Sequence, residues 1–585
     1  MAAGFDGSND SKRGARARVG HISHGDGRDG QFAPSTSQAE PKYEGTAADQ
    51  RDMHELGRVQ ELRDLAAAAI DHAQRNFQFM SVLGFGCTLI GTWNFLLGLI
   101  AFGLTDGGTA GLIYGFIICL AGFSCVYLSV AEMASMAPTS SAQKLSEIPQ
   151  LHQWYDQSTR STTRADHDMQ DTWSQSDGKA RSVYPGDSFW TIPRKLRRAS
   201  TDPGNDYPQI CSTAYLAGTI IQGLIILNHP TYSPQPYQGT LLVWAVMLFC
   251  VIFNVFLAKR LPFVEGVLLI IYVVGFFAII IPLWVLAPRS PASEVFTTFN
   301  NEGDWSSKGV AVLVGLGGIV PSLAGYDCAV HMAEEIKDSS KTLPQAIVLG
   351  VAVNGIMGLI MVITICFTLG DTDSILGTTT LYPFIQVFFN ATNSYAATNT
   401  MTAIIVIVFT SAVISEIATS SRQLWSFARD GGLPFSRWIS PGANIPLNAI
   451  YVSIVIVVLV SLINLGSTVA LNAINSVTIS ALMASYLLTI GCLVYRRLGG
   501  WPLPARRWSL GRAGLPINIA SLAFLLPLFV FAFFPLATPV TPSSMNWGVV
   551  MFGGVVVVAT VYYAVEGRKA YTPPVALLQR EHYEM

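Results

Sequence analysis

Charged residues are scarce in this chain, and their scarcity excludes most soluble architectures. Asp, Glu, Lys and Arg make up 13% of the 585 residues, whereas hydrophobic residues make up 51%. A soluble domain carries about 25% charged residues. The composition therefore predicts an all-α polytopic membrane protein.

Cysteine is also sparse, and the motifs of soluble enzymes are missing. The eight cysteines all lie in apolar segments and lack the spacing of a metal site or a redox motif. The chain has no Walker loop and no His-Glu-x-x-His sequence. We therefore expect no enzyme, no cofactor, no bound metal and no nucleic-acid partner.

The two ends of the chain differ in composition from its centre. Residues 1–75 are rich in polar residues and predict a disordered cytoplasmic tail without a cleavable signal peptide, and 567–585 predict a short cytoplasmic tail. Between them lie about twelve apolar spans, most of which meet the requirement of roughly 20 residues for a crossing helix. These spans lie near 79–103, 109–135, 211–228, 240–258, 263–287, 309–332, 345–369, 399–420, 447–464, 468–495, 514–535 and 546–565.

Lys and Arg are absent from alternate connections between the spans. The connections 229–239, 371–398, 464–467 and 536–545 contain neither residue, whereas the connections between them are basic. Because basic loops stay in the cytoplasm, this pattern places both termini there and requires an even number of crossings. Twelve crossings satisfy it.

Two of the spans are interrupted by residues that break helices. At membrane depth, a broken helix is tolerated only where protein or a watery cavity satisfies the freed backbone groups. Two interrupted helices in corresponding halves indicate the substrate site of a secondary transporter. The interrupting residues are Gly84, Gly86, Gly91 and Thr92 in the first span, and Gly315, Gly317, Gly318, Pro321 and Gly325 in the sixth, which also carries Asp327.

Several sequence runs resemble one family. The similar runs are AEMASMAPT at 131–139, AGTIIQG at 217–223, AGYDCAVHMAEEIKD at 324–338, LPQAI at 343–347 and RQLWSFARDGGLP at 422–434. Together they resemble the fungal amino acid/choline/GABA permeases of the amino acid-polyamine-organocation (APC) superfamily. The resemblance covers about residues 75–570, so 76–566 are interpreted as a transmembrane permease domain.

This resemblance implies a LeuT-like fold, in which two inverted five-helix repeats are followed by two more helices. The first and sixth helices would unwind at about Thr88 to Thr92 and Leu323 to Asp327. The residues expected to bind substrate are Thr88, Gly91, Thr92, Trp93, Leu323, Ala324, Gly325, Tyr326 and Asp327. The expected partners are a small amine or amino acid such as GABA, choline or a polyamine, a coupling proton and membrane lipid. The plasma membrane is the expected location, with the vacuole or another endomembrane as the alternative.

Individual residues at this site allow a second interpretation. Asp327 either attracts an amine or a coupling proton, or caps the helix that restarts after the break. Trp93 and Tyr326 either form aromatic walls around a cation or pack the core. The glycines either admit the substrate or allow close helix packing. Glu132 and Glu265 lie near the cytoplasmic boundary, where snorkelling or loop salt bridges explain them.

The chain departs from the family pattern between residues 143 and 210. This span is polar and charged, and the third apolar segment that follows it is only about 18 residues long, so the third helix looks truncated. The span is either a divergent cytoplasmic loop or an artefact of the gene model. One alternative to an active transporter is therefore an inactive product. A second, separate alternative is a nontransporting sensor.

Overall fold

The computed structural model describes residues 79–136 and, with short gaps, 206–567. The predicted N-terminal tail, the polar span up to residue 205 and residues 568–585 of the predicted C-terminal tail lie outside the described residues. Within the described part the elements are helices, and β-pairing is limited to an isolated bridge between Asp106 and Asn301. The predicted all-α class is confirmed.

Ten helical segments of the described chain are long and apolar enough to cross a membrane. The first combines α2 and α3, which are separated by a single residue. The helices of these ten segments are α2 (Phe79–Ile90), α3 (Thr92–Thr105), α4 (Gly108–Met136), α7 (Asp206–Asn228), α8 (Pro236–Phe256), α9 (Leu261–Leu286), α13 (Ser339–Thr368), α16 (Tyr395–Arg429), α19 (Thr468–Leu498), α20 (Gly514–Phe531) and α21 (Gly548–Tyr562).

Two predicted spans form shorter helices. The span near 447–464 contains α18 (Leu447–Ser461). The span near 309–332 consists of short pieces, which are α11 (Lys308–Gly315), η4 (Leu316–Gly318), α12 (Val320–Leu323) and the 3-10 helix η5 (Tyr326–Glu335). The total of twelve crossings and the inverted repeats therefore stay predictions.

The third helix is longer than its apolar segment indicated. Helix α7 begins at Asp206 and has 23 residues, which exceeds the roughly 20 needed to cross. Its first turn includes Pro208, and proline is tolerated there because the amide it lacks would have no intrahelical partner. The predicted length of about 18 residues is therefore too short, whereas truncation relative to the family pattern stays a prediction.

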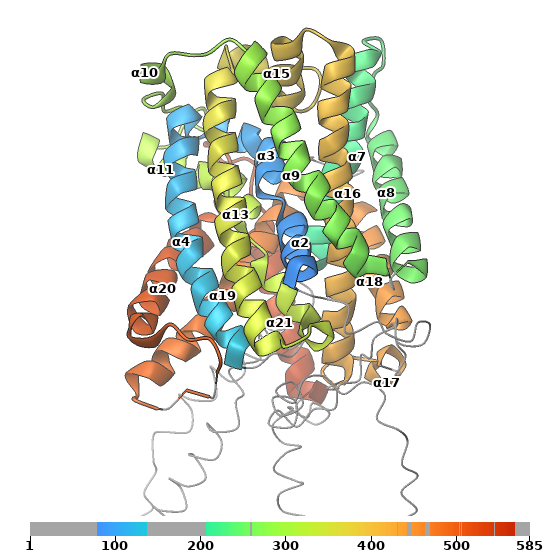
Figure 1. Cartoon of the computed structure of the whole chain (residues 1–585), viewed down its shortest axis with the longest axis vertical. Helices are drawn as coiled ribbons and strands as arrows, with labels where there is room; N and C mark the ends of the chain where they lie inside the picture. The colour runs from blue at the N-terminus through green and yellow to red at the C-terminus, as the bar shows by residue number, and fades with distance from the viewer. Residues whose placement is uncertain are drawn as a thin grey trace, which may run out of the picture. The chain divides into compact units, whose positions relative to one another are not determined.

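Short helices lie at the two ends of the helical bundle (Figure 1). Helices α10 (Ala292–Val295) and α15 (Pro383–Thr392) lie at the upper end, and α17 (Ser436–Ile439) lies at the lower end. We call these the α10 end and the α17 end. The remaining short helices are α14 (Thr372–Leu376), η7 (Gly511–Ala513) and the π-helix η8 (Tyr563–Gly567).

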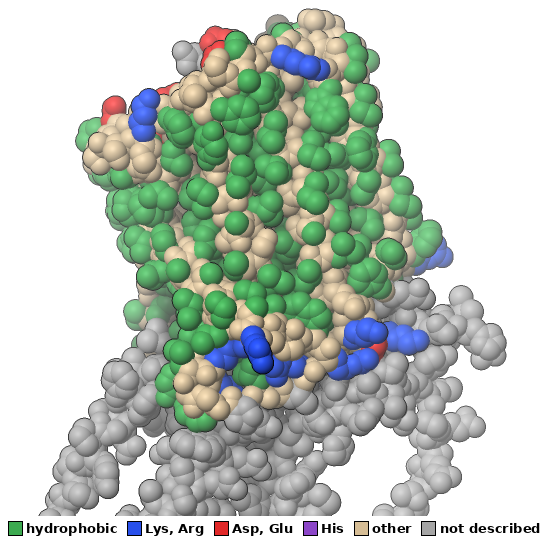
Figure 2. Space-filling view, turned by 60° about the vertical axis from the view of Figure 1, so that its left-hand side comes forward, with side chains coloured by type: hydrophobic (Ala, Val, Ile, Leu, Met, Phe, Trp, Pro, Cys, Tyr) green, Lys and Arg blue, Asp and Glu red, His purple; other side chains and the backbone are tan. Residues whose placement is uncertain are grey.

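A belt of hydrophobic side chains separates the two ends (Figure 2). Most of the Lys and Arg side chains visible in this view lie at the α17 end of the bundle, below the belt. A hydrophobic belt with basic residues gathered on one side is typical of a protein embedded in a bilayer.

Small residues bring the long helices close together. Helices α4 and α13 run side by side (Figure 1). A Cβ added at Gly355 of α13 would lie 2.4 Å from a methyl carbon of Leu120, and one added at Gly358 would lie 2.6 Å from the ring of Phe116. Close backbone approach through glycine is the usual way that helices pack in membranes.

Candidate substrate site at two interrupted helices

The first interruption is confined to one residue. Helix α2 ends at Ile90, α3 begins at Thr92, and Gly91 between them has a φ of 49°. This left-handed conformation favours glycine. A Cβ added at Gly91 would also lie 2.4 Å from the side-chain oxygen of Asn94. Thr88 lies within α2, so the unwound stretch is narrower than the predicted Thr88 to Thr92.

The second interruption is wider and lies where it was predicted. Helix α12 ends at Leu323, Ala324 is extended, and Gly325 has a φ of 106° before η5 begins at Tyr326. One side chain, Tyr127 of α4, satisfies both sides of this break. Its hydroxyl donates to the carbonyl oxygen of Leu323 at 3.0 Å and accepts from the amide of Gly325 at 2.9 Å. Protein groups therefore stabilise the broken backbone, as a site at membrane depth requires.

The two interruptions meet. The side-chain oxygens of Thr92 and Tyr326 lie 3.5 Å apart, and both residues are buried. The Tyr326 ring packs edge-on against Tyr127, with centroids 4.8 Å apart. A Cβ added at Gly325 would lie 3.8 Å from Ile90, the last residue of α2. The structure thus brings predicted site residues of both helices together.

Asp327 is buried beside this junction. Its Oδ1 accepts a hydrogen bond of 2.6 Å from the hydroxyl of Tyr486 on α19. The N-cap position of η5 is occupied by Gly325, and Asp327 lies within its first turn. Asp327 therefore connects the sixth helix to α19 through its side chain.

Trp93 packs against α9, whereas Tyr326 packs against Tyr127 of α4. Trp93 is fully buried, and its ring centroid lies 5.5 Å from that of Tyr272 and 6.2 Å from that of Phe276, both on α9. This arrangement favours the packing interpretation of Trp93.

Glu265 of α9 is a residue whose position the sequence did not indicate. It is fully buried, and its two carboxylate oxygens accept hydrogen bonds from Thr88 at 2.9 Å and Ser415 at 2.6 Å. The interpretation as a snorkelling or loop residue is wrong, because α9 turns this carboxylate towards α2 and α16 rather than towards solvent. Thr88 lies three residues before the Gly91 break, so Glu265 adjoins the candidate site.

Ion pairs connect helix ends near the end of the sixth helix. Glu335 pairs with Arg422 of α16, and Asp338 pairs with Arg507. The acidic segment after the sixth helix therefore forms charge pairs with residues distant in the sequence.

Glu132 of α4 forms a second, buried group of charges. Its carboxylate is fully buried, pairs with Arg497, and lies 3.2 Å from the Arg506 guanidinium. The amide of Leu510 also donates to it at 3.2 Å. Snorkelling is therefore the wrong explanation for Glu132, whereas a salt bridge to a loop is the right one.

Asp106 lies in the short connection between α3 and α4. It is buried and accepts a hydrogen bond of 3.0 Å from the amide of Gly303. Burial raises the pKa of its carboxyl above the ordinary value, and the nearby Glu302 acts in the same direction. The hydrogen bond from Gly303 opposes this shift in pKa.

Comparison with known proteins connects this geometry to a family. The sequence model of the amino acid permease family matches residues 207–557, which is more than half of the chain. The choline transporter of Saccharomyces cerevisiae is 28% identical over 531 residues, covering 89% of this chain and 87% of that protein. A putative amino acid/polyamine transporter of Macrophomina phaseolina is 25% identical and covers 80% and 96% of the two chains.

Amino-acid permease 2 of Neurospora crassa is also similar, at 25% identity over 514 residues and 86% of each chain. The three relatives therefore cover 80–89% of this chain, and the family model includes the interrupted sixth helix. This chain is a multi-pass integral membrane protein that belongs to the amino acid permease family.

Proposed function

We propose that this protein is a secondary active transporter that imports a small amino-group compound, such as GABA, an amino acid, choline or a polyamine. The observation that carries the proposal is the meeting of two interrupted helices at Gly91 and Gly325, with Thr92 and Tyr326 in contact across the junction. Transporters place substrate where discontinuous helices meet.

The broken ends supply the partial charges that such a substrate needs. Helix α3 starts at Thr92, and the positive end of its dipole suits a substrate carboxylate. Helix α2 ends at Ile90, and the carbonyl oxygens of its last turn suit an ammonium group. Asp327 adds a formal negative charge beside the junction. An amine, with or without a carboxylate, fits this arrangement.

Proton coupling is the second part of the proposal, and Glu265 is the residue assigned to it. Its partners are the hydroxyls of Thr88 and Ser415. A hydroxyl can donate to a carboxylate or accept from a carboxylic acid, so the same partners serve both protonation states. Because Thr88 belongs to the interrupted helix, a change of protonation alters the bond that holds α2 against α9 and α16. This links proton movement to alternating access.

Orientation in the membrane is proposed from the basic residues. Lys and Arg gather at the lower end in Figure 2, and the positive-inside rule makes such an end cytoplasmic. We therefore propose that both termini lie in the cytoplasm. The plasma membrane stays the proposed location, with the vacuole or another endomembrane as the alternative.

The test is uptake of radiolabelled GABA, choline, amino acids and putrescine by yeast that lacks its own transporters for them. The informative variant is Gly91→Val, because a β-branched residue is strained at a φ of 49° and would collide with Asn94. The matched control is Gly86→Ala in the same interrupted helix, where an added Cβ meets no atom within 4 Å.

We expect uptake by the natural chain and by Gly86→Ala, and its loss in Gly91→Val at equal surface abundance. If the natural chain reaches the surface and takes up none of these compounds, the proposed substrate class is wrong. If Gly91→Val transports normally, the break at Gly91 is not part of the transport site.

A further inference from the structure

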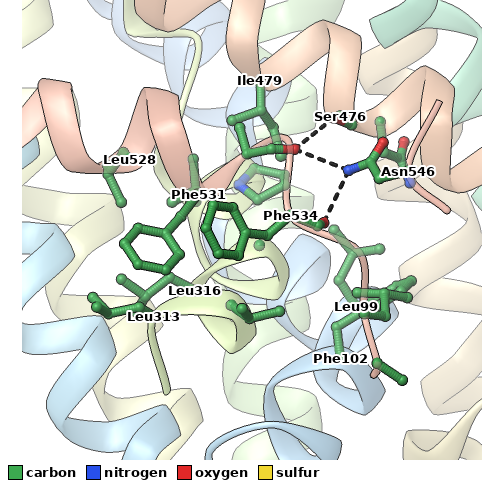
Figure 3. Close-up of a pocket in the computed structure, with 18 of the residues that line it drawn as sticks. Leu99, Phe102, Leu313, Leu316, Ser476, Ile479, Leu528, Phe531, Phe534 and Asn546 are labelled. Atoms are coloured by element: carbon green, nitrogen blue, oxygen red, sulfur yellow. Dashed lines mark hydrogen bonds between the residues drawn. The ribbon is translucent and has the colours of Figure 1, made fainter. Parts of the chain in front are cut away.

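A cavity of about 290 Å³ lies beside the interrupted helices (Figure 3). One wall comes from α3 and from the α11–α12 half of the sixth helix, and includes Leu99 and Leu316. The opposite wall comes from α19, α20 and the connection that follows α20, and includes Ile479 and Phe531. None of the residues predicted to bind substrate lines this cavity, so the space is separate from the candidate substrate site.

The chemistry of the lining disfavours a charged ligand. Most of the lining side chains are aliphatic or aromatic, and none is Asp, Glu, Lys, Arg or His. A buried ammonium or carboxylate would lose its hydration there without gaining a partner of opposite charge, which is strongly unfavourable. The cavity therefore does not suit the charged amines and amino acids of the proposed transport function.

Polar side chains at one end of the cavity already hold the connection after α20. The side-chain Nδ2 of Asn546 donates to the carbonyl oxygens of Ala532 and Phe534, both at 3.1 Å (Figure 3). The Ser476 hydroxyl also donates to the carbonyl oxygen of Ala532, at 2.5 Å. These bonds join α19 and the connection into one wall. They leave apolar contact as the main interaction that the cavity can offer, with a polar edge for one hydroxyl.

The cavity has unfilled space next to the sixth helix. Leu313 and Gly317 both line it, lie one helical turn apart, and are exposed. A Cβ added at Gly317 meets no atom within 4 Å, and Gly317 has no positive φ. Backbone geometry therefore does not require glycine here, and a larger residue fits at this position of the cavity lining without a clash at its Cβ.

We propose that this cavity binds an uncharged, mainly apolar molecule of about the size of a two-ring aromatic compound, and that binding holds the interrupted helices in place. An apolar cavity of about 150 Å³ accepts benzene, so nearly twice that volume accepts two fused rings. A molecule here contacts α3 and α11–α12 on one side and α19–α20 on the other. Alternating access moves such groups relative to each other, so occupancy slows transport.

The probe for this proposal is 2-naphthalenemethanol, which has two fused rings, one hydroxyl and no charge. Its effect on the thermal unfolding temperature of the purified, detergent-solubilised protein is compared between the natural chain and Gly317→Leu, which fills the cavity. Leu313→Trp fills it from the neighbouring turn and serves if Gly317→Leu does not fold. The matched control is Gly554→Leu in α21, where an added Cβ also meets nothing within 4 Å.

We expect the probe to raise the unfolding temperature of the natural chain and of Gly554→Leu, and to leave the cavity-filled variants unchanged. No shift in the natural chain, or an equal shift in a folded cavity-filled variant, would overturn the proposal. Partition of the probe into detergent affects every variant alike and is thereby distinguished from binding.

The effect on uptake rests on the proposed transport function, whereas the unfolding measurement does not. At a probe concentration equal to its Kd, half of the transporters are occupied, so we expect Vmax to fall about twofold with KM unchanged. A rise in KM alone would place the probe in the substrate site and overturn the proposal. Absence of uptake without probe would instead contradict the transport function and leave the binding result to decide the cavity.

Discussion

Replacing Tyr127 with Phe tests how the break in the sixth helix is stabilised. The lost hydroxyl is bonded to the carbonyl of Leu323 at 3.0 Å and to the amide of Gly325 at 2.9 Å. An unpaired buried polar group costs about 1–3 kcal/mol, so two such groups cost about 2–6 kcal/mol. Side-chain hydrogen bonds in membrane proteins average only about 0.6 kcal/mol each, because the reference state finds other partners. The break holds both groups in non-helical geometry, so we expect a loss of about 2–4 kcal/mol.

The assay is unfolding by SDS titration in mixed micelles, which gives the change in the free energy of unfolding. The matched control is Tyr114→Phe on the same helix, because Tyr114 is 44% exposed and its hydroxyl is not enclosed by the core. We expect Tyr114→Phe to change the free energy of unfolding by less than about 0.5 kcal/mol. Equal effects of the two substitutions would refute the argument that Tyr127 stabilises the break.

Three further predictions concern carboxylates. Glu265→Gln keeps one acceptor and one donor for its two hydroxyl partners but cannot exchange a proton. We therefore expect proteoliposomes that contain this variant to lose proton-driven accumulation of substrate and to keep substrate exchange. Unchanged accumulation would contradict the coupling role of Glu265. Burial raises the pKa of Asp106, so its native state binds the proton more tightly than the unfolded state. The contribution of the Asp106 carboxyl to stability is thus fully present below about pH 3.9 and is lost as pH rises through the higher native pKa. In a measurement of the free energy of unfolding against pH, Asp106→Asn is expected to flatten the curve in this range. Glu132→Gln leaves the guanidinium of Arg497 without its buried counter-charge and is expected to lower the free energy of unfolding in the SDS titration by about 3 kcal/mol. Asp338→Asn breaks a partly exposed ion pair and is expected to lower it by at most about 1 kcal/mol.

Much of the fold could be predicted because membrane helices are encoded locally. A run of about 20 apolar residues must form a helix in lipid, since no other conformation satisfies its backbone there. Glycine and proline indicated which two spans are interrupted, whereas the family resemblance placed the breaks near Gly91 and Gly325, where each glycine takes a positive φ that other residues avoid. The start of α7 was missed because its first turn is polar and contains a proline, so hydropathy did not mark it.

The candidate site was only partly predictable. The sequence indicated the two breaks and Asp327, but it did not indicate Glu265, Tyr127 or Tyr486. Glu265 follows closely after a basic boundary in the sequence, so its position alone favours a place near solvent. Its burial depends on how α9 is rotated and tilted against α2 and α16, which is a property of packing.

The sequence by itself determined the membrane class, the position of most helices and which two of the spans are interrupted. These features depend on hydropathy and on backbone preference, and both act over a few neighbouring residues. The tertiary structure decided which polar groups meet. Tyr127 reaches Gly325 across 198 residues, and Glu265 reaches Thr88 across 177. Such contacts depend on the rotation of each helix about its own axis, and only the packing of all the helices together sets that rotation.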